Sequence, residues 1–245
     1  MATTLTHAAL PDAERRFYSR MAIALAVVVL AGFSSTFYLP GIVVFPRPTP
    51  SYTPLMVVHG VVFTAWMLLL IAQTQFIAAG NRALHLRLGK AGFGLALVML
   101  LLMFLVTGAQ IPRANQPPFV TPQTWSAIPY FIIPQFALFI GLGWHYRRQP
   151  ALHKRFMLLA ALQMMEPAIG RLPLAPPSLG GQLLDSALSW LMIIPLVIHD
   201  LRSLGRVHAA TLVGAIVTAG ALLLRYAVWQ TEGWQQLATT LSSWI

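Results

Sequence analysis

The residues of this chain that are best suited to chemistry are its histidines. Neutral imidazole is a common metal ligand and a frequent axial ligand of haem. The candidates fall near the ends of apolar runs or in the segments that join them, and they are His85, His145, His153, His199 and His208. Asp200 is a further candidate, either as a ligand or as an acceptor that orients an imidazole. These residues predict a site for haem b or for a non-haem metal ion.

Two arrangements of these histidines are possible. His145 and His199 end two apolar runs at the same expected height, so they are the best predicted pair of axial haem ligands. The alternative is a non-haem metal held by His85, His153 and His208. The simplest structural alternative is that each imidazole anchors a helix end among lipid headgroups. A ligand site requires at least two of the five rings to converge, whereas anchors have no reason to do so.

A second group of polar residues lies inside the apolar runs. Charged side chains at membrane depth are costly, so they face the protein interior or a wet cavity and find partners. Counting a rise of about 1.5 Å per residue places most of the group at one level, in the outer third of the membrane. We therefore expect Arg225 to pair with Glu166 or Asp185. The group, which is either an intramembrane binding site or a set of interhelical contacts, comprises His59, Gln73, Gln163, Glu166, Asp185 and Arg225.

The elements that must position both groups are membrane-spanning helices. The 245 residues are 57% hydrophobic and 9% charged, whereas an ordinary soluble domain is about one quarter charged. A span needs about 20 apolar residues, and such runs lie at 21–41, 53–78, 88–111, 124–146, 153–171, 181–199 and 207–229. The pattern predicts an all-α integral membrane protein with a bundle of about seven transmembrane helices. Residues 1–20 form an N-terminal segment, 21–230 the membrane domain and 231–245 a short C-terminal tail.

The orientation of the chain in the membrane follows from its basic residues, because Lys and Arg in short loops are retained on the cytoplasmic side. A cytoplasmic N-terminus puts most of them on one side, and only Arg47, Arg113, Arg171 and Arg225 on the other. The net charge of +10 is then a topology signal, which excludes nucleic acid as a partner. The first run is interpreted as a retained signal anchor. The cytoplasmic set is Arg15, Arg16, Arg20, Arg82, Arg87, Lys90, Arg147, Arg148, Lys154, Arg155, Arg202 and Arg206.

Two segments carry short motifs. The first has an HG pair at His59, a later Gln73 and an LHxxLGxxG sequence that contains His85; the second has HxxxM from His153 to Met157. These motifs resemble a family of bacterial multi-pass membrane proteins of unknown function, and HxxxM is also similar to small membrane proteins grouped with cytochrome oxidase assembly. The resemblance implies that these five residues matter and that the protein lies in the bacterial inner membrane. It covers only these segments, and Lys90 stands where the family commonly has Arg.

Three functional hypotheses follow. The first is a haem- or metal-binding protein of the inner membrane in electron transfer or respiratory-complex biogenesis, with the lipid bilayer and a respiratory-chain protein as partners. The second is a small-molecule carrier that uses the intramembrane polar group. The third is an enzyme acting on a lipid-phase substrate, in which a His-bound metal activates water or oxygen. The chain has no cysteine, which excludes disulfides, thiol nucleophiles and Cys-ligated metals.

Overall fold

A computed structural model describes the chain except for residues 1–11, 43–52, 115, 175 and 177. The regular secondary structure of the described residues is helical. Five stretches are long and apolar enough to cross a membrane, which is the architecture of a multi-pass membrane protein: Pro54–Ala78, Arg82–Gln110, Pro122–His145, Leu179–Leu204 and Ala209–Val228. The elements are α1 (Asp12–Gly32), the π-helix η1 (Ser34–Tyr38), α2 (Pro54–Ala78), α3 (Arg82–Gln110), α4 (Pro122–His145), α5 (Pro150–Leu162), α6 (Met165–Ile169), α7 (Leu179–Leu191), α8 (Ile194–Leu204), α9 (Ala209–Val228) and α10 (Glu232–Ser242).

Two of the expected helices are broken, and proline explains both breaks. Proline lacks an N–H and its ring clashes with the carbonyl four residues earlier. Pro167 therefore opposes helical continuation at Gln163, where α5 gives way to α6. Pro195 does the same at Leu191, where α7 ends, and α8 begins three residues later at Ile194. In α4, by contrast, the helix continues through Pro134.

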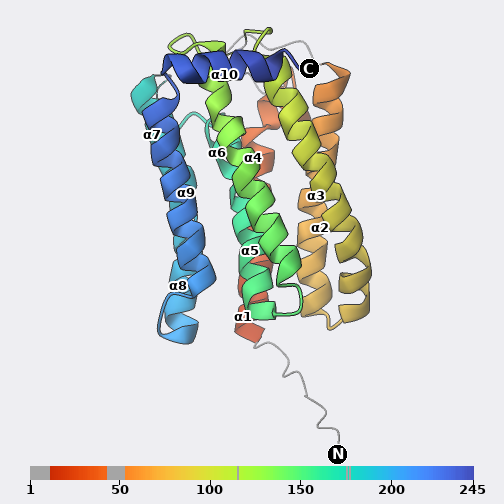
Figure 1. Ribbon diagram of the computed structural model, residues 1–245. Helices are drawn as coiled ribbons and strands as arrows, with labels where there is room; N and C mark the ends of the chain where they lie inside the picture. Colours follow the sequence, from red (N-terminus) through yellow and green to blue (C-terminus); the bar gives the residue numbers. More distant parts are fainter. Residues whose placement is uncertain (1–11, 43–52, 115, 175, 177) are drawn as a thin grey trace, which may run out of the picture.

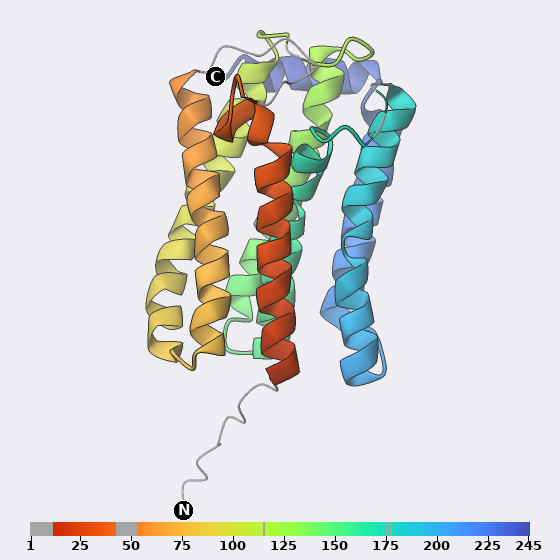
Figure 2. The same ribbon diagram turned by 180° about the vertical axis from the view of Figure 1, so that it is seen from behind.

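The helices stand side by side, with their turns gathered at two ends (Figures 1 and 2). The start of α1 and the α2–α3, α4–α5 and α8–α9 turns share the lower end in Figure 1. The opposite end is crossed by α10, which packs on α3 and α4. The segment expected to be a tail therefore contains a helix, because Trp234 and Ala238, one helical turn apart, are both buried against the bundle.

The core and the outer surface are both apolar, as expected where lipid replaces water. Phe136 and Phe139 of α4 and Met99 of α3 are fully buried. Leu223 and Ile216, in the interior of α9, are 72% and 61% exposed. Large aliphatic side chains exposed in mid-helix suit contact with lipid tails.

Small residues allow the helices to approach closely, a feature common in membrane bundles. A Cβ built on Gly32 of α1 would lie 2.2 Å from the backbone oxygen of Ala168 in α6. At the α2–α3 turn, Gly80 has φ +72°, a conformation that glycine adopts without steric cost. This tight turn makes α2 and α3 antiparallel neighbours, so that the end of α2 faces the start of α3.

Candidate functional site

Gln73 and His85 meet across the α2–α3 turn. With its amide oriented so that both ends are satisfied, Gln73 Nε2 donates to His85 Nδ1 (2.6 Å) and to the His85 carbonyl (3.0 Å). Gln73 Oε1 accepts from the Gly89 backbone N–H (3.2 Å). The ring of His85 is thus held at the start of α3 by a side chain of α2, and one of its two nitrogens is engaged.

His153 lies beside His85. It is in the first turn of α5, which begins at Pro150 directly after the α4–α5 turn. The His153 Nδ1 is 2.8 Å from the carbonyl of Gly143 near the end of α4; because a carbonyl only accepts, Nδ1 carries the proton. The ring centroids of His85 and His153 are 6.2 Å apart and their planes cross at 82°. Two imidazoles from different helices therefore lie beside each other at this end of the bundle.

Close packing surrounds the pair. A Cβ on Gly143 would lie 2.8 Å from Met157 Sδ, so this position of α4 accommodates only glycine without movement of Met157. Further along α3, Phe93 stacks on Trp144 at 4.4 Å between ring centroids. Of the motif residues, Gln73, His85, His153 and Met157 thus gather around the α2–α3 and α4–α5 turns. His59 is the exception, since its ring stacks on Phe63 (4.0 Å between centroids) in its own helix.

The predicted pair of His145 and His199 is not brought together. His145 is exposed and its ring meets the adjacent Tyr146. His199 instead stacks on Phe17 of α1, with 4.0 Å between ring centroids. Equal height in the membrane did not make the two helix ends neighbours. Within the described part of the chain, no group of three or more His, Cys, Asp or Glu side chains is placed to hold a metal ion.

Asp200 is committed to an ion pair. Its Oδ1 accepts from Arg155 Nε (3.0 Å) and Nη2 (2.5 Å). Its Oδ2 accepts from the Thr211 hydroxyl (2.5 Å) and from the His208 backbone N–H (3.1 Å). Asp200 and Arg155 are 0% and 1% exposed. The candidate ligand is therefore a structural group, and Arg155, expected to be a loop charge that marks the cytoplasmic side, is buried between α5 and α8.

His208 is likewise occupied. It precedes α9, and its Nδ1 accepts from the Ala210 backbone N–H (3.1 Å) as an N-terminal cap. Burial lowers the pKa of His208 below its usual value, and the positive charge of Arg155 lowers it further. A neutral ring keeps the lone pair on Nδ1 that the cap requires. His208 is thus explained by helix capping.

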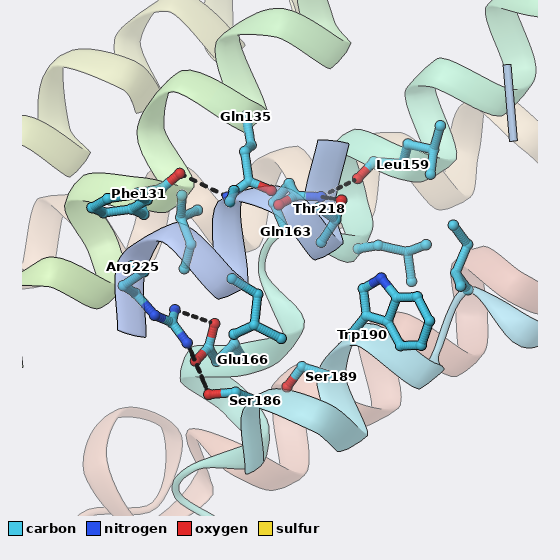
Figure 3. Close-up of a pocket in the computed structure, with 15 residues that line it drawn as sticks. Phe131, Gln135, Leu159, Gln163, Glu166, Ser186, Ser189, Trp190, Thr218 and Arg225 are labelled. Carbon is cyan, nitrogen blue, oxygen red and sulfur yellow. Dashed lines mark hydrogen bonds and ion pairs between the residues drawn. The ribbon is translucent and has the colours of Figure 1, made fainter. Parts of the chain in front are cut away.

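A second polar site lies towards the other end, between α6, α7 and α9 (Figure 3). Arg225 Nη1 and Nη2 donate to the two oxygens of Glu166 at 2.8 and 2.7 Å. Ser186 of α7 accepts from Arg225 Nη2 (2.9 Å) and donates to Glu166 Oε1 (2.5 Å). Its oxygen is also 2.8 Å from the Tyr226 hydroxyl. The expected pairing of Arg225 with an intramembrane carboxylate is confirmed, and Glu166 is the partner.

The other residues of the predicted intramembrane group are divided between the two ends of the bundle. Gln163, at the α5–α6 break, lies 3.4 Å from the Thr218 hydroxyl and borders the same cavity as Glu166. Asp185 is buried next to Ser186, with Oδ2 3.7 Å from a Cβ built on Gly170. Gln73 belongs to the histidine site at the opposite end. The polar residues therefore form two sites.

Several residues of these sites escaped the sequence analysis. Ser186 and Tyr226 bridge the outer ion pair, yet each is one residue from a residue that was identified, on a different helical face. Gln135 follows Pro134 in α4 and was overlooked because one amide in an apolar run is unremarkable. Arg155 left one indirect signal: the chain has only 6 acidic residues against 16 basic ones, so a basic partner for Asp200 could be expected, although its identity could not.

Comparisons with protein-family models, with curated proteins and with solved structures found no match to this chain. The function of the protein is therefore inferred from the chemistry of the histidine site and of the Glu166–Arg225 site.

Proposed function

We propose that this protein is a haem- or metal-binding multi-pass membrane protein and that His85 of α3 and His153 of α5 are the protein ligands. The observation that carries the proposal is the position of two imidazoles from different helices beside each other, each with Nδ1 already hydrogen-bonded. In metal sites the second ring nitrogen typically donates a hydrogen bond, as His153 Nδ1 does here, which orients the ring and raises its basicity; His85 Nδ1 accepts instead. The Nε2 atoms are left as the ligands.

The spacing suits a shared metal. Metal–imidazole bonds of about 2.0 Å on each side put the two ligating nitrogens about 4 Å apart. Ring centroids separated by 6.2 Å are compatible with that spacing when each Nε2 points towards the other ring. A direct hydrogen bond between the rings would require a closer approach. Perpendicular ring planes are no obstacle, because each imidazole binds through one nitrogen.

The donor set favours haem over a non-haem ion. A structural zinc site takes four protein ligands and a catalytic one takes three, whereas His85 and His153 supply two. Haem iron needs only axial ligands from the protein. When bound, haem supplies one-electron redox chemistry. If His85 and His153 both held the iron, no position on it would be left for oxygen or substrate, so we propose electron transfer rather than catalysis, in a respiratory chain or its assembly.

Gln73 sets a condition on binding. As a donor to His85 Nδ1, it leaves the ring proton on Nε2. Coordination by His85 therefore requires the proton to move to Nδ1 and the carboxamide to turn, so that Gln73 Oε1 accepts from Nδ1–H. This turn gives up the bonds of Gln73 to the His85 carbonyl and to the Gly89 N–H, so coordination by His85 has a cost in hydrogen bonding.

We also propose that the chain crosses the bacterial inner membrane seven times, with its N-terminus in the cytoplasm. Besides the five long apolar stretches, α1 and the α5–α6 pair run along the bundle (Figure 2). Arg82 at the start of α3, Arg147 in the α4–α5 turn and Arg206 in the α8–α9 turn belong to the end of the bundle where α1 begins. Basic loops are retained in the cytoplasm. Reporter fusions after residues 150 and 203 should give a cytoplasmic signal, and a fusion after residue 117 the opposite; a periplasmic signal at 150 contradicts this topology.

The proposal is tested by titrating purified protein with haem and recording optical spectra. Wild type should show saturable binding of one haem per chain. The variants His85→Ala and His153→Ala should each lose the bis-imidazole spectrum, because one axial ligand is missing. The matched control is His145→Ala, an exposed histidine at the same end of the bundle, which should bind as wild type does.

Two results would overturn the assignment. One is a spectrum that survives the double change His85→Ala and His153→Ala. The other is a wild-type protein that binds neither haem nor, by elemental analysis after equilibration with iron, copper or zinc, any metal ion above the level of that double variant. Gel filtration of each variant shows whether a loss of binding reflects a loss of the fold.

A further inference from the structure

The second polar site borders a cavity that the proposed haem site does not use. The cavity lies between four helical spans and is lined by side chains of α4, α5–α6, α7 and α9. Its polar lining includes Glu166, Arg225, Gln135, Gln163 and Thr218, and its walls are otherwise largely aliphatic and aromatic. We call this space the chamber (Figure 3). Its volume is about 40 Å³, and one water molecule needs about 10–15 Å³.

Helix breaks surround the chamber. Gln163 lies at the break between α5 and α6, and Ile193 at the break between α7 and α8; both line the chamber. Gln135 follows Pro134 in α4. Irregular backbone at membrane depth is tolerated where it is buried in protein or lines a polar cavity. In membrane carriers, solute sites are typically formed by such discontinuous helices.

Two buried polar atoms of the chamber residues lack partners among the described residues. Gln135 is 8% exposed; its Nε2 donates to the Phe131 carbonyl (2.8 Å), while its Oε1 accepts no hydrogen bond. Arg225 is 2% exposed, and its Nε–H donates to no acceptor although both Nη atoms are bonded. A buried unsatisfied polar atom is costly and uncommon in native proteins. Among the residues that line the chamber, one acceptor and one donor thus remain without a hydrogen-bond partner.

We propose that the chamber binds a small uncharged molecule that both accepts and donates hydrogen bonds, such as a short primary amide. The carbonyl oxygen of the ligand accepts from Arg225 Nε–H, and its N–H donates to Gln135 Oε1. The ligand is uncharged because Glu166 and Arg225 neutralise each other, so a charged guest would be buried without a counter-ion. The aliphatic walls receive its apolar part. The site is that of a solute carrier, and it is independent of His85 and His153.

Acetamide and acetone are the probes that test this site. The two molecules are similar in size and both present a carbonyl, but only acetamide has N–H donors. Binding is followed by saturation-transfer NMR on the full-length protein in lipid nanodiscs, with empty nanodiscs as the blank. Acetamide should receive saturation from the wild-type protein, and acetone should bind about tenfold more weakly, because Gln135 Oε1 stays unpaired beside it.

The variant Gln135→Leu should weaken acetamide binding by about tenfold and abolish the preference over acetone. The control is Thr107→Val in α3, a buried hydroxyl bonded only within its helix and outside the chamber lining, which should bind as wild type does. Equal affinity for acetamide and acetone in the wild type overturns the proposal without any variant. So does unchanged acetamide binding in Gln135→Leu. A chamber that holds water alone gives no acetamide signal in any protein, and that result also contradicts the proposal.

Discussion

Two buried arginine–carboxylate pairs hold this bundle together, and they differ in how completely they are satisfied. In the pair of Arg155 and Asp200, both carboxylate oxygens accept two hydrogen bonds each, and Arg155 Nη1 donates to the Ala151 carbonyl (2.7 Å). Every polar atom of the pair has a partner. In the pair of Glu166 and Arg225, the two charges also meet bidentately, but Arg225 Nε has no partner among the described residues and the pair borders the chamber.

We interpret the first pair as structural and propose a binding role for the second. The pair of Arg155 and Asp200, which we call the closed pair, joins α5 to α8 and leaves no hydrogen-bonding group for a ligand. The pair of Glu166 and Arg225, which we call the open pair, retains hydrogen-bonding capacity next to a cavity. The histidines follow the same rule, because His208 is used in a helix cap, whereas His85 and His153 each bond through Nδ1 and present their remaining nitrogen. Among these four groups, hydrogen-bonding capacity left beside a cavity or a second imidazole distinguishes the two candidate sites from the two structural groups.

The largest effect is expected when the closed pair is broken. Asp200→Asn removes the negative charge and leaves Arg155 buried without a counter-ion, which should lower the free energy of unfolding by about 3–5 kcal/mol. Thermal unfolding in detergent measures the change, with Glu232→Gln as control because Glu232 is exposed on α10. Replacing both members, by Arg155→Met with Asp200→Leu, should recover part of the loss, because no charge is left unpaired but the Thr211 hydroxyl and the His208 N–H lose their acceptor. A double variant as unstable as Asp200→Asn would contradict this account.

A smaller loss is expected at the open pair. Glu166→Gln keeps an acceptor for Arg225, and the adjacent chamber admits water-sized molecules that solvate the guanidinium. We expect a cost of about 1–3 kcal/mol, below that of Asp200→Asn in the same unfolding assay. If the two substitutions prove equally costly, the distinction between a closed and an open pair fails.

Removal of single hydroxyls sharpens the comparison. Thr211 donates to Asp200, and Thr211→Val should cost about 1–3 kcal/mol because the lost hydrogen bond is to a buried charge. Thr218 lines the chamber, where its hydroxyl is 3.4 Å from Gln163 Nε2. Thr218→Val should cost less than about 1 kcal/mol, since that contact is long and uncharged. Both changes preserve side-chain shape, so unfolding midpoints of the two variants can be compared directly; the reverse order would assign the structural role to the wrong pair.

Features that belong to a single helix could be predicted from the sequence, whereas features that depend on which helices pack together could not. Apolar runs showed the membrane helices, and the scarcity of intramembrane charges led correctly from Arg225 to a carboxylate partner. The burial of Arg155 was not predictable in this way, because it requires α8 to pack beside α5. The helix α10 was missed because its apolar positions, Trp234 and Ala238, are too few to suggest a span and were interpreted as a tail.

The histidines show the same limit. Expected heights favoured His145 with His199, but height along a helix does not determine which helices are neighbours. The tight turn at Gly80 and the short α4–α5 turn instead bring His85 near His153. Both residues belong to the two short motifs noted in the sequence, so the motifs located this site better than the estimate of membrane depth did.

Electron paramagnetic resonance of the ferric haem-loaded protein tests most directly whether His85 and His153 would together hold the haem iron. Two imidazoles form a strong axial field, so the wild-type protein should give a low-spin ferric signal. His153→Ala and His85→Ala should each convert it to a high-spin signal, because one axial position is lost, while His145→Ala keeps the low-spin signal. A low-spin signal that persists in both His85→Ala and His153→Ala, or a haem that is high-spin in the wild type, would contradict the proposal.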